Sequence, residues 1–171
     1  MVKWVTAAAM LAAVYATNWM LETFGMVPVG FGLEAPAGVY LAGLVFGLRD
    51  VLHETGGPRW VVGAIVCGAA LSYVLSDGAT IPGGVVSIAV ASAAAFLLSE
   101  FADFAVYTPL RERHWPIAAA VSNVAGAVVD SAVFLWLAFG SLEFIAGQVV
   151  GKAYMVAVAL PLVWLSRRNA R

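Results

Sequence analysis

Ionisable and amide side chains recur at helical spacing inside the apolar stretches of this sequence. Asn18 and Glu22 lie four residues apart, and Gln148 and Lys152 repeat that interval. Residues separated by three, four or seven positions share one face of an α-helix. A charge within a membrane helix is costly and faces the bundle interior or an aqueous pathway. The same spacings join three further sets, which are Asp50 with Glu54, Glu100 with Asp103 and Tyr107, and Asn123 with Asp130.

Five predicted helices therefore present one polar face each, as a polar interior cavity requires. Paired carboxylates such as Glu100 and Asp103 can do acid–base work, but in so apolar a chain they favour a proton or substrate site. The sequence contains no His-Glu-x-x-His, no Gly-x-Ser-x-Gly and no phosphate loop. Cys67 is the only cysteine, so a disulfide within the chain and a cysteine metal site are excluded. We assign His53 and His114 no metal or catalytic role, and predict neither enzymatic activity nor a cofactor.

The depth of two buried charges follows from the rise of 1.5 Å per residue. Asp130 lies roughly 21 Å along its helix when counted from Pro116, and Lys152 lies roughly 22 Å from Arg167. Equal depth on sequential helices predicts an Asp130–Lys152 ion pair. Such a pair could belong to a functional site or could simply hold two helices together.

The composition of the chain predicts that lipid is its solvent. Of the 171 residues, 63% are hydrophobic and 11% charged, and the mean hydropathy is +0.93. Crossing the hydrocarbon core takes about 20 apolar residues. The sequence predicts an all-α integral membrane protein, a single domain over 1–171 that forms a six-transmembrane-helix bundle. The predicted spans are 4–26, 35–51, 58–76, 81–106, 116–140 and 143–165, joined by connectors at 25–34, 53–58, 77–82, 109–116 and 140–143.

Basic residues give the predicted orientation. Eight of the nine Lys and Arg fall at the N-terminus, in the second and fourth connectors, or at the C-terminus. The positive-inside rule makes that side cytoplasmic, so both termini are predicted in the cytoplasm of a plasma (inner) membrane protein. Lys152, inside the sixth span, is the exception. The eight residues are Lys3, Arg49, Arg59, Arg111, Arg113, Arg167, Arg168 and Arg171. Arg49, Asp50 and Glu54 could be ordinary interfacial charges.

Small residues and tryptophans indicate how the helices pack. Gly43-x-x-x-Gly47 and Gly147-x-x-x-Gly151 favour close helix packing, and such surfaces are also compatible with a homodimer. Trp19 and Trp136 are expected deep in the membrane and near a polar face. The remaining tryptophans are expected in an interfacial aromatic belt, namely Trp4, Trp60, Trp115 and Trp164.

The chain resembles the queuosine-precursor transporters, also called the VUT family, over about residues 15 to 165. The strongest matching stretches are 91–103 (Ala-Ser-Ala-Ala-Ala-Phe-Leu-Leu-Ser-Glu-Phe-Ala-Asp) and 106–111 (Val-Tyr-Thr-Pro-Leu-Arg). Shorter matching stretches lie before and after these two, in the same order along the chain as in the family. They are 17–19, 36–39, 48–50, 122–123, 130–134 and 138–139, with Lys152 ahead of Pro161. The resemblance implies a six-span importer of 7-deazaguanine bases such as preQ0, preQ1 or queuine.

That resemblance and the polar faces together give a set of expected site residues. A carboxylate can accept hydrogen bonds from the N1–H and 2-amino edge of such a base, an amide can meet its O6, and aromatic rings can stack on it. The expected base contacts are Asn18, Glu100, Asp103, Asn123, Asp130 and Gln148, with stacking from Trp19, Phe96, Tyr107, Phe134 and Trp136. Glu22, Asp50 and Lys152 are expected in gating or proton coupling. The expected partners are a small-molecule substrate (a deazapurine base) and the lipid bilayer, with no nucleic acid.

Another class of transporter subunit fits the same size and span count. The substrate-binding subunit of an energy-coupling-factor vitamin transporter docks on ATPases through an Ala-x-x-x-Ala surface on an early helix. Ala8-x-x-x-Ala12 and Ala9-x-x-x-Ala13 match that spacing. An intramembrane enzyme or a purely structural bundle remains a further alternative.

Overall fold

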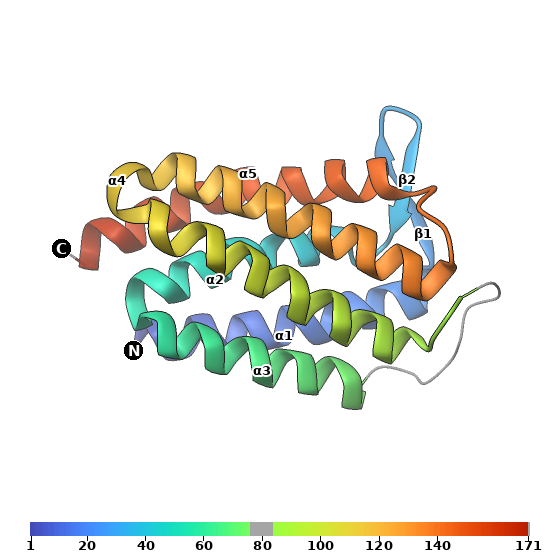
Figure 1. The fold of residues 1–171 in the computed structure, drawn as a ribbon, viewed down its shortest axis with the longest axis horizontal. Helices are drawn as coiled ribbons and strands as arrows, with labels where there is room; N and C mark the ends of the chain where they lie inside the picture. Colours follow the sequence, from blue (N-terminus) through green and yellow to red (C-terminus); the bar gives the residue numbers. More distant parts are fainter. Residues whose placement is uncertain (76–83, 171) are drawn as a thin grey trace.

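The computed structural model describes residues 1–75 and 84–170 and shows a bundle of long helices with one small hairpin (Figure 1). The predicted connector at 77–82 lies outside the described residues. In chain order the elements are α1 (Val2–Phe24), β1 (Met26–Gly30), β2 (Leu33–Pro36), α2 (Val39–Gly56), α3 (Pro58–Leu75), α4 (Ile88–Phe139) and α5 (Ile145–Ala170).

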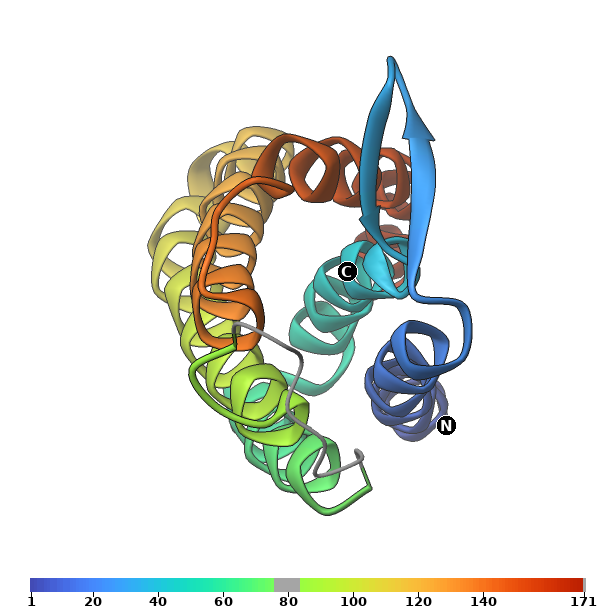
Figure 2. The same cartoon turned by 90° about the vertical axis from the view of Figure 1, so that its right-hand side faces the viewer.

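The longest helix, α4, reverses direction near its middle, so that two arms run side by side (Figures 1 and 2). His114 has φ −144° and ψ 69°, which are not helical values. Pro116 lies just beyond it, and proline cannot donate the amide hydrogen bond that would continue the helix. Apolar side chains of arm 88–113 pack against those of arm 115–139 along their length. The predicted break at 109–116 is therefore the position of this reversal.

The described residues contain four helices long and apolar enough to cross a membrane, namely α1, α3, α4 and α5. The all-α membrane class is thus supported. The predicted count of six spans is not, because helix length and hydropathy identify only these four helices among the described residues. One reason is that α4 counts once although it has two arms. The other is that α2 carries Arg49, Asp50 and Glu54, which make it too polar to qualify.

Helix α2 lies in the middle of the bundle (Figure 2) and contacts α1, α3, α4 and α5. Two of its glycines allow this close approach. A Cβ on Gly43 would lie 2.6 Å from the carbonyl oxygen of Lys152, and one on Gly47 would collide with Ala159. On α5, a Cβ on Gly151 would come within 2.8 Å of Val39. The prediction that these glycine motifs pack helices closely is confirmed. Because they are used within the chain, they give no support to the expected homodimer.

Residues 26–36 form an antiparallel hairpin, which the all-α prediction missed. Met26 pairs with Pro36 and Val27 with Ala35, and the register shifts between Pro28 and Gly30. The turn needs left-handed backbone, with φ +95° at Gly30 and φ +72° at Gly32. The second helix consequently begins at residue 39, not at 35 as predicted. The hairpin stands at the end of the bundle away from the two termini (Figure 1).

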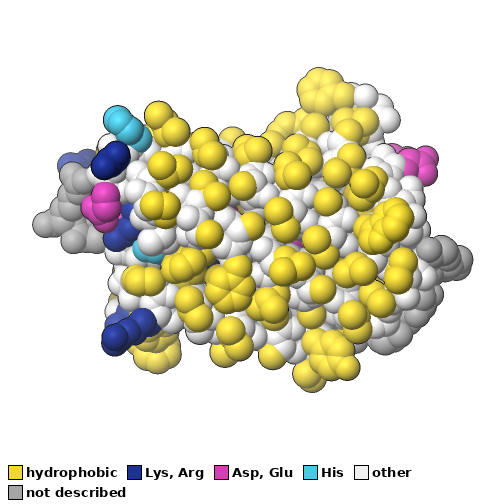
Figure 3. Space-filling model, viewed as in Figure 1, with side chains coloured by type: hydrophobic (Ala, Val, Ile, Leu, Met, Phe, Trp, Pro, Cys, Tyr) yellow, Lys and Arg dark blue, Asp and Glu magenta, His cyan; other side chains and the backbone are white. Residues whose placement is uncertain are grey.

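Basic side chains gather at one end of the molecule, acidic side chains lie at both ends, and the visible surface between the ends is apolar (Figure 3). Both termini lie at the same end of the bundle (Figure 1). Lys and Arg side chains collect there, while hydrophobic side chains cover the middle of the visible face (Figure 3). Such an apolar belt is what a lipid-embedded bundle presents to the hydrocarbon core.

Candidate functional site

A cavity lies inside the bundle and takes lining residues from all five helices. The space between atoms inside it amounts to about 620 Å³, part of it open to solvent. Four of its side chains are aromatic or carboxylate groups that the sequence singled out. The lining residues are Val14, Thr17, Asn18, Leu21, Pro36, Gly38, Val39, Ala42, Val45, Phe46, Ser72, Ser92, Ala95, Phe96, Ser99, Glu100, Asp130, Phe134 and Gln148.

One wall of the cavity is organised by Lys152. Its Nζ donates to Asp130 Oδ2 at 2.6 Å, to Ser131 Oγ at 2.7 Å and to Gln148 Oε1 at 2.5 Å. An ammonium has three protons, so all three are used. The ion pair predicted from equal depth is therefore present. Lys152 occupies the Gln148 oxygen, and within the part of the chain that the structure describes no side chain accepts from the amide NH₂ of Gln148, which is therefore available as a donor. The second oxygen of Asp130 accepts from Ser99 Oγ at 3.4 Å.

Another part of the lining is built around Asn18 of α1. Its Nδ2 donates to Ser72 Oγ at 2.8 Å, and its Oδ1 accepts from Ser92 Oγ at 2.8 Å. Three helices are thereby joined at one amide. Sequence reasoning missed both serines, because a serine in a helix can bond its own backbone and so gives no signal of its own.

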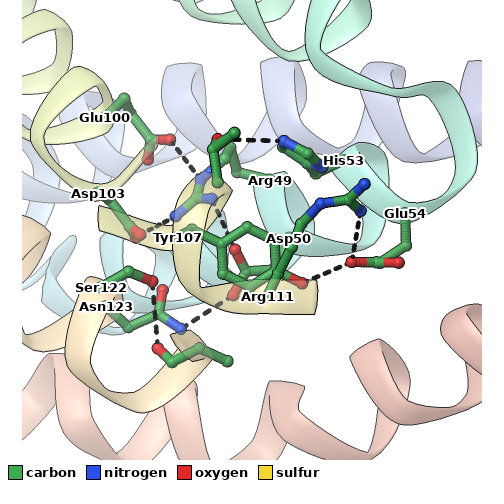
Figure 4. Close-up of polar contacts among 12 residues, drawn as sticks. Arg49, Asp50, His53, Glu54, Glu100, Asp103, Tyr107, Arg111, Ser122 and Asn123 are labelled. Carbon is green, nitrogen blue, oxygen red and sulfur yellow. Dashed lines mark hydrogen bonds and ion pairs between the residues drawn. The ribbon is translucent and has the colours of Figure 1, made fainter. Parts of the chain in front are cut away.

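Beside the cavity, Arg49 lies at the centre of a buried cluster of acidic residues (Figure 4). Its guanidinium forms ion pairs with Asp50 (Nη1–Oδ1, 2.7 Å) and Glu100 (Nε–Oε2, 3.5 Å). A third ion pair joins Nη2 to Asp103, and the guanidinium carbon lies 5.3 Å from the centre of the Tyr107 ring. The prediction of Arg49 in a cytoplasmic connector is wrong: α2 continues to Gly56, and its central position encloses the side chain completely.

The cluster takes up several residues that were expected to contact a ligand. Asn123 Nδ2 donates to Asp50 Oδ2 at 3.1 Å. Asn123, Asp103 and Tyr107 are buried but do not line the cavity. Glu100 belongs to both places, because it lines the cavity and pairs with the guanidinium. It is the link between the cavity and the cluster.

A second ionic layer lies nearer the end that carries the termini. Glu54 Oε1 accepts from Tyr107 Oη at 2.8 Å, from Arg111 Nη1 at 3.0 Å and from Arg167 Nη1 at 3.1 Å. These donors come from the first arm of α4 and from α5. The Glu54 carboxylate of α2 therefore bonds both the first arm of α4 and α5, and these contacts close the bundle at that end.

The two deep tryptophans of the prediction lie on the outside. Trp19 is 47% exposed and Trp136 is 56% exposed, so neither faces the polar interior. The ring of Trp19 stands edge-on to Phe24. Consecutive residues differ by about 100° around a helix, so a residue next to the inward-facing Asn18 cannot share its direction. Glu22, near the end of α1, is exposed as well.

Comparison with known proteins gives one match. A family model described as "putative vitamin uptake transporter" matches residues 36–166, which is more than half of the chain. No curated protein matches, and no solved structure matches.

Proposed function

Because this chain belongs to the family described as putative vitamin uptake transporters, we propose that it imports a 7-deazaguanine base, a precursor of queuosine. The observation that carries the proposal is the cavity inside the bundle, with polar groups fixed in its wall and aromatic rings beside them. The base would be preQ0, preQ1 or queuine.

The polarity of the wall suits one edge of such a base. Asp130 can accept from the N1–H and 2-amino donors, while the amide NH₂ of Gln148 can donate to O6. Phe96 and Phe134 line the same cavity and offer faces for stacking. The proposed base contacts are thus the predicted residues that line the cavity, namely Asn18, Phe96, Glu100, Asp130, Phe134 and Gln148.

The other expected site residues act through these contacts in the proposal. Lys152 positions both Asp130 and Gln148 by its hydrogen bonds. Asp103, Asn123 and Asp50 belong to the cluster around the guanidinium, which we assign to gating.

We further propose that the chain crosses the plasma (inner) membrane six times, with both termini cytoplasmic. Each arm of α4, 88–113 and 115–139, is long enough at 1.5 Å per residue for a hydrocarbon core of about 30 Å. The 18 residues of α2 span about 27 Å and are shielded from lipid by the other helices. Lys and Arg side chains gather at the end with the termini (Figure 3), which the positive-inside rule assigns to the cytoplasm.

Binding to the purified protein tests the proposal directly. Thermal unfolding in detergent would be followed with queuine, guanine, adenine, biotin and riboflavin. We expect queuine to raise the unfolding temperature of the wild type, with little response in Asp130→Asn or Gln148→Ala. Glu143→Gln is the matched control, because Glu143 is exposed and outside the cavity. A shift with a vitamin but not with queuine would contradict the proposed substrate, and loss of the shift in the control would contradict the proposed site.

The second candidate is a substrate-binding subunit that depends on partner ATPases. It is favoured by one observation, namely that Ala8 and Ala12 are exposed on the outer side of α1, where a partner could dock. Uptake of queuine into liposomes that contain only this protein would exclude the dependence on ATPases.

A further inference from the structure

The cluster around Arg49 has more acidic groups than cations. Asp50, Glu100 and Asp103 all pair with one guanidinium, and all four side chains are fully buried. Full ionisation would leave two negative charges without a counter-ion. A buried carboxyl group in that position binds a proton instead of staying charged.

Neighbouring cations do not supply the missing charge. Among the described residues, the other buried Lys and Arg side chains are Lys152 and Arg167, which pair with Asp130 and Glu54. His53 is also buried, but its ring lies tilted against Phe104 and edge-on to Tyr107, and its Nε2 lies 3.4 Å from the hydroxyl of Thr108.

The geometry favours a proton over a metal ion as the missing charge. The guanidinium already occupies the position between the three carboxyl groups (Figure 4). In the part of the chain that the structure describes, no three His, Cys, Asp or Glu side chains are arranged to hold a metal ion.

Glu100 is the carboxyl group least satisfied by the cluster. Its distance to the guanidinium, 3.5 Å, is the longest of the three ion pairs. Asp50 additionally receives a hydrogen bond from Asn123, whereas Glu100, like Asp103, has only its ion pair with Arg49 among the described residues. Glu100 is also the member of the cluster that lines the cavity. A proton bound there can exchange with the cavity.

We propose that Glu100 is the proton-binding site that couples uptake to a proton gradient, which rests on the proposed function as a transporter. A hydronium ion in the cavity gives its proton to the Glu100 carboxylate, leaving water and a neutral carboxylic acid. The acid O–H can then donate to an acceptor of the substrate, so substrate and proton bind cooperatively. Loss of the same proton returns the carboxylate to its pair with Arg49, and the substrate loses that hydrogen bond.

Polar groups continue from this site to the end with the termini. Arg49 stacks on the Tyr107 ring, and Tyr107 Oη donates to Glu54, which also accepts from Arg111 and Arg167. This row crosses the layer that closes the bundle.

Infrared spectroscopy of the purified protein tests the proton directly, without any transport. We expect the wild type at neutral pH to show the C=O stretch of a buried carboxylic acid, and Glu100→Gln to weaken this band by the share that Glu100 contributes. Glu143→Gln makes the same chemical change at an exposed position and should keep the band. The inference is overturned if the wild type lacks the band at neutral pH, or if Glu100→Gln retains it in full. The wild-type spectrum decides this even if the variant does not fold.

Liposome uptake of queuine tests the coupling separately. Wild-type uptake should rise when the lumen is made more alkaline than the medium, and this stimulation should be lost in Glu100→Gln and kept in Glu143→Gln. Equal stimulation in Glu100→Gln would overturn the coupling role. Absence of any wild-type uptake would instead overturn the proposed function, while the infrared result would still decide whether Glu100 holds a proton.

Discussion

Replacing Lys152 with methionine should lower the free energy of unfolding by about 3–5 kcal/mol, the cost of breaking a buried ion pair by removing one partner. Methionine keeps most of the length of the side chain but removes all three hydrogen bonds, to Asp130, Ser131 and Gln148. Asp130 would then be left with an uncompensated charge, and its side chain is only 17% exposed, so water screens it little.

A double-mutant cycle with Asp130 shows whether the lost unfolding free energy comes from the Asp130–Lys152 ion pair itself. Lys152→Met combined with Asp130→Asn removes the orphaned charge, so the double variant should lose about 1–3 kcal/mol less than the sum of the two single variants. Unfolding in mixed micelles with increasing SDS gives the free energies. Lys3→Met is the matched control, because Lys3 interacts with the ring of Trp60 near the chain end and should cost below about 1 kcal/mol. A Lys152→Met loss of less than about 1 kcal/mol, as for a solvated surface pair, would refute this reasoning.

Three further perturbations test the packing, the closing layer and the cavity. Gly43→Leu should destabilise the bundle by about 1–3 kcal/mol or more, since its Cβ has no room, whereas Gly63→Leu has open space around it and should unfold like the wild type in the same SDS titration. Glu54→Gln should lower the free energy of unfolding by about 1–3 kcal/mol, because it weakens three charge-assisted or buried hydrogen bonds. Its control is Glu112→Gln, at a carboxylate 71% exposed, which should lower it by less than about 1 kcal/mol. Equal losses in the two variants would show that the closing layer adds no stability. Asn18→Leu should abolish the thermal shift with queuine while changing the unfolding free energy by less than about 1 kcal/mol, because the serines it bonds can turn to their own backbone; an unchanged shift would remove Asn18 from the site.

The position of Arg49 shows why spacing along one helix predicts only part of a site. The sequence places Arg49 beside Asp50 near the end of a predicted span, where an interfacial position and a buried one are both open. The choice depends on how far α2 continues and on which helices surround it. In the structure α2 continues to Gly56 and four helices contact it, so Arg49 is enclosed, and the first arm of α4 supplies Glu100 and Asp103 as counter-ions.

The division of the polar residues between cavity and cluster depends on the same neighbour relations. Helical periodicity correctly put Glu100, Asp103 and Tyr107 on one face of one helix. It could not show that Glu100 lines the cavity while the other two meet Arg49 and Glu54, because one or two turns along α4 decide which partner each side chain meets.

Composition and spacing alone determined that this is an apolar helical membrane protein with polar inner faces, and the rise per residue alone predicted the Asp130–Lys152 pair. These are properties of single helices and of their depth, which the order of residues specifies. Only the tertiary structure decided that residues 26–36 form a hairpin, that Trp19 points outward and that Arg49 lies at the centre of three carboxyl groups. Those outcomes depend on contacts between segments far apart in the chain, and the angular position of a side chain on its own helix does not specify its neighbour.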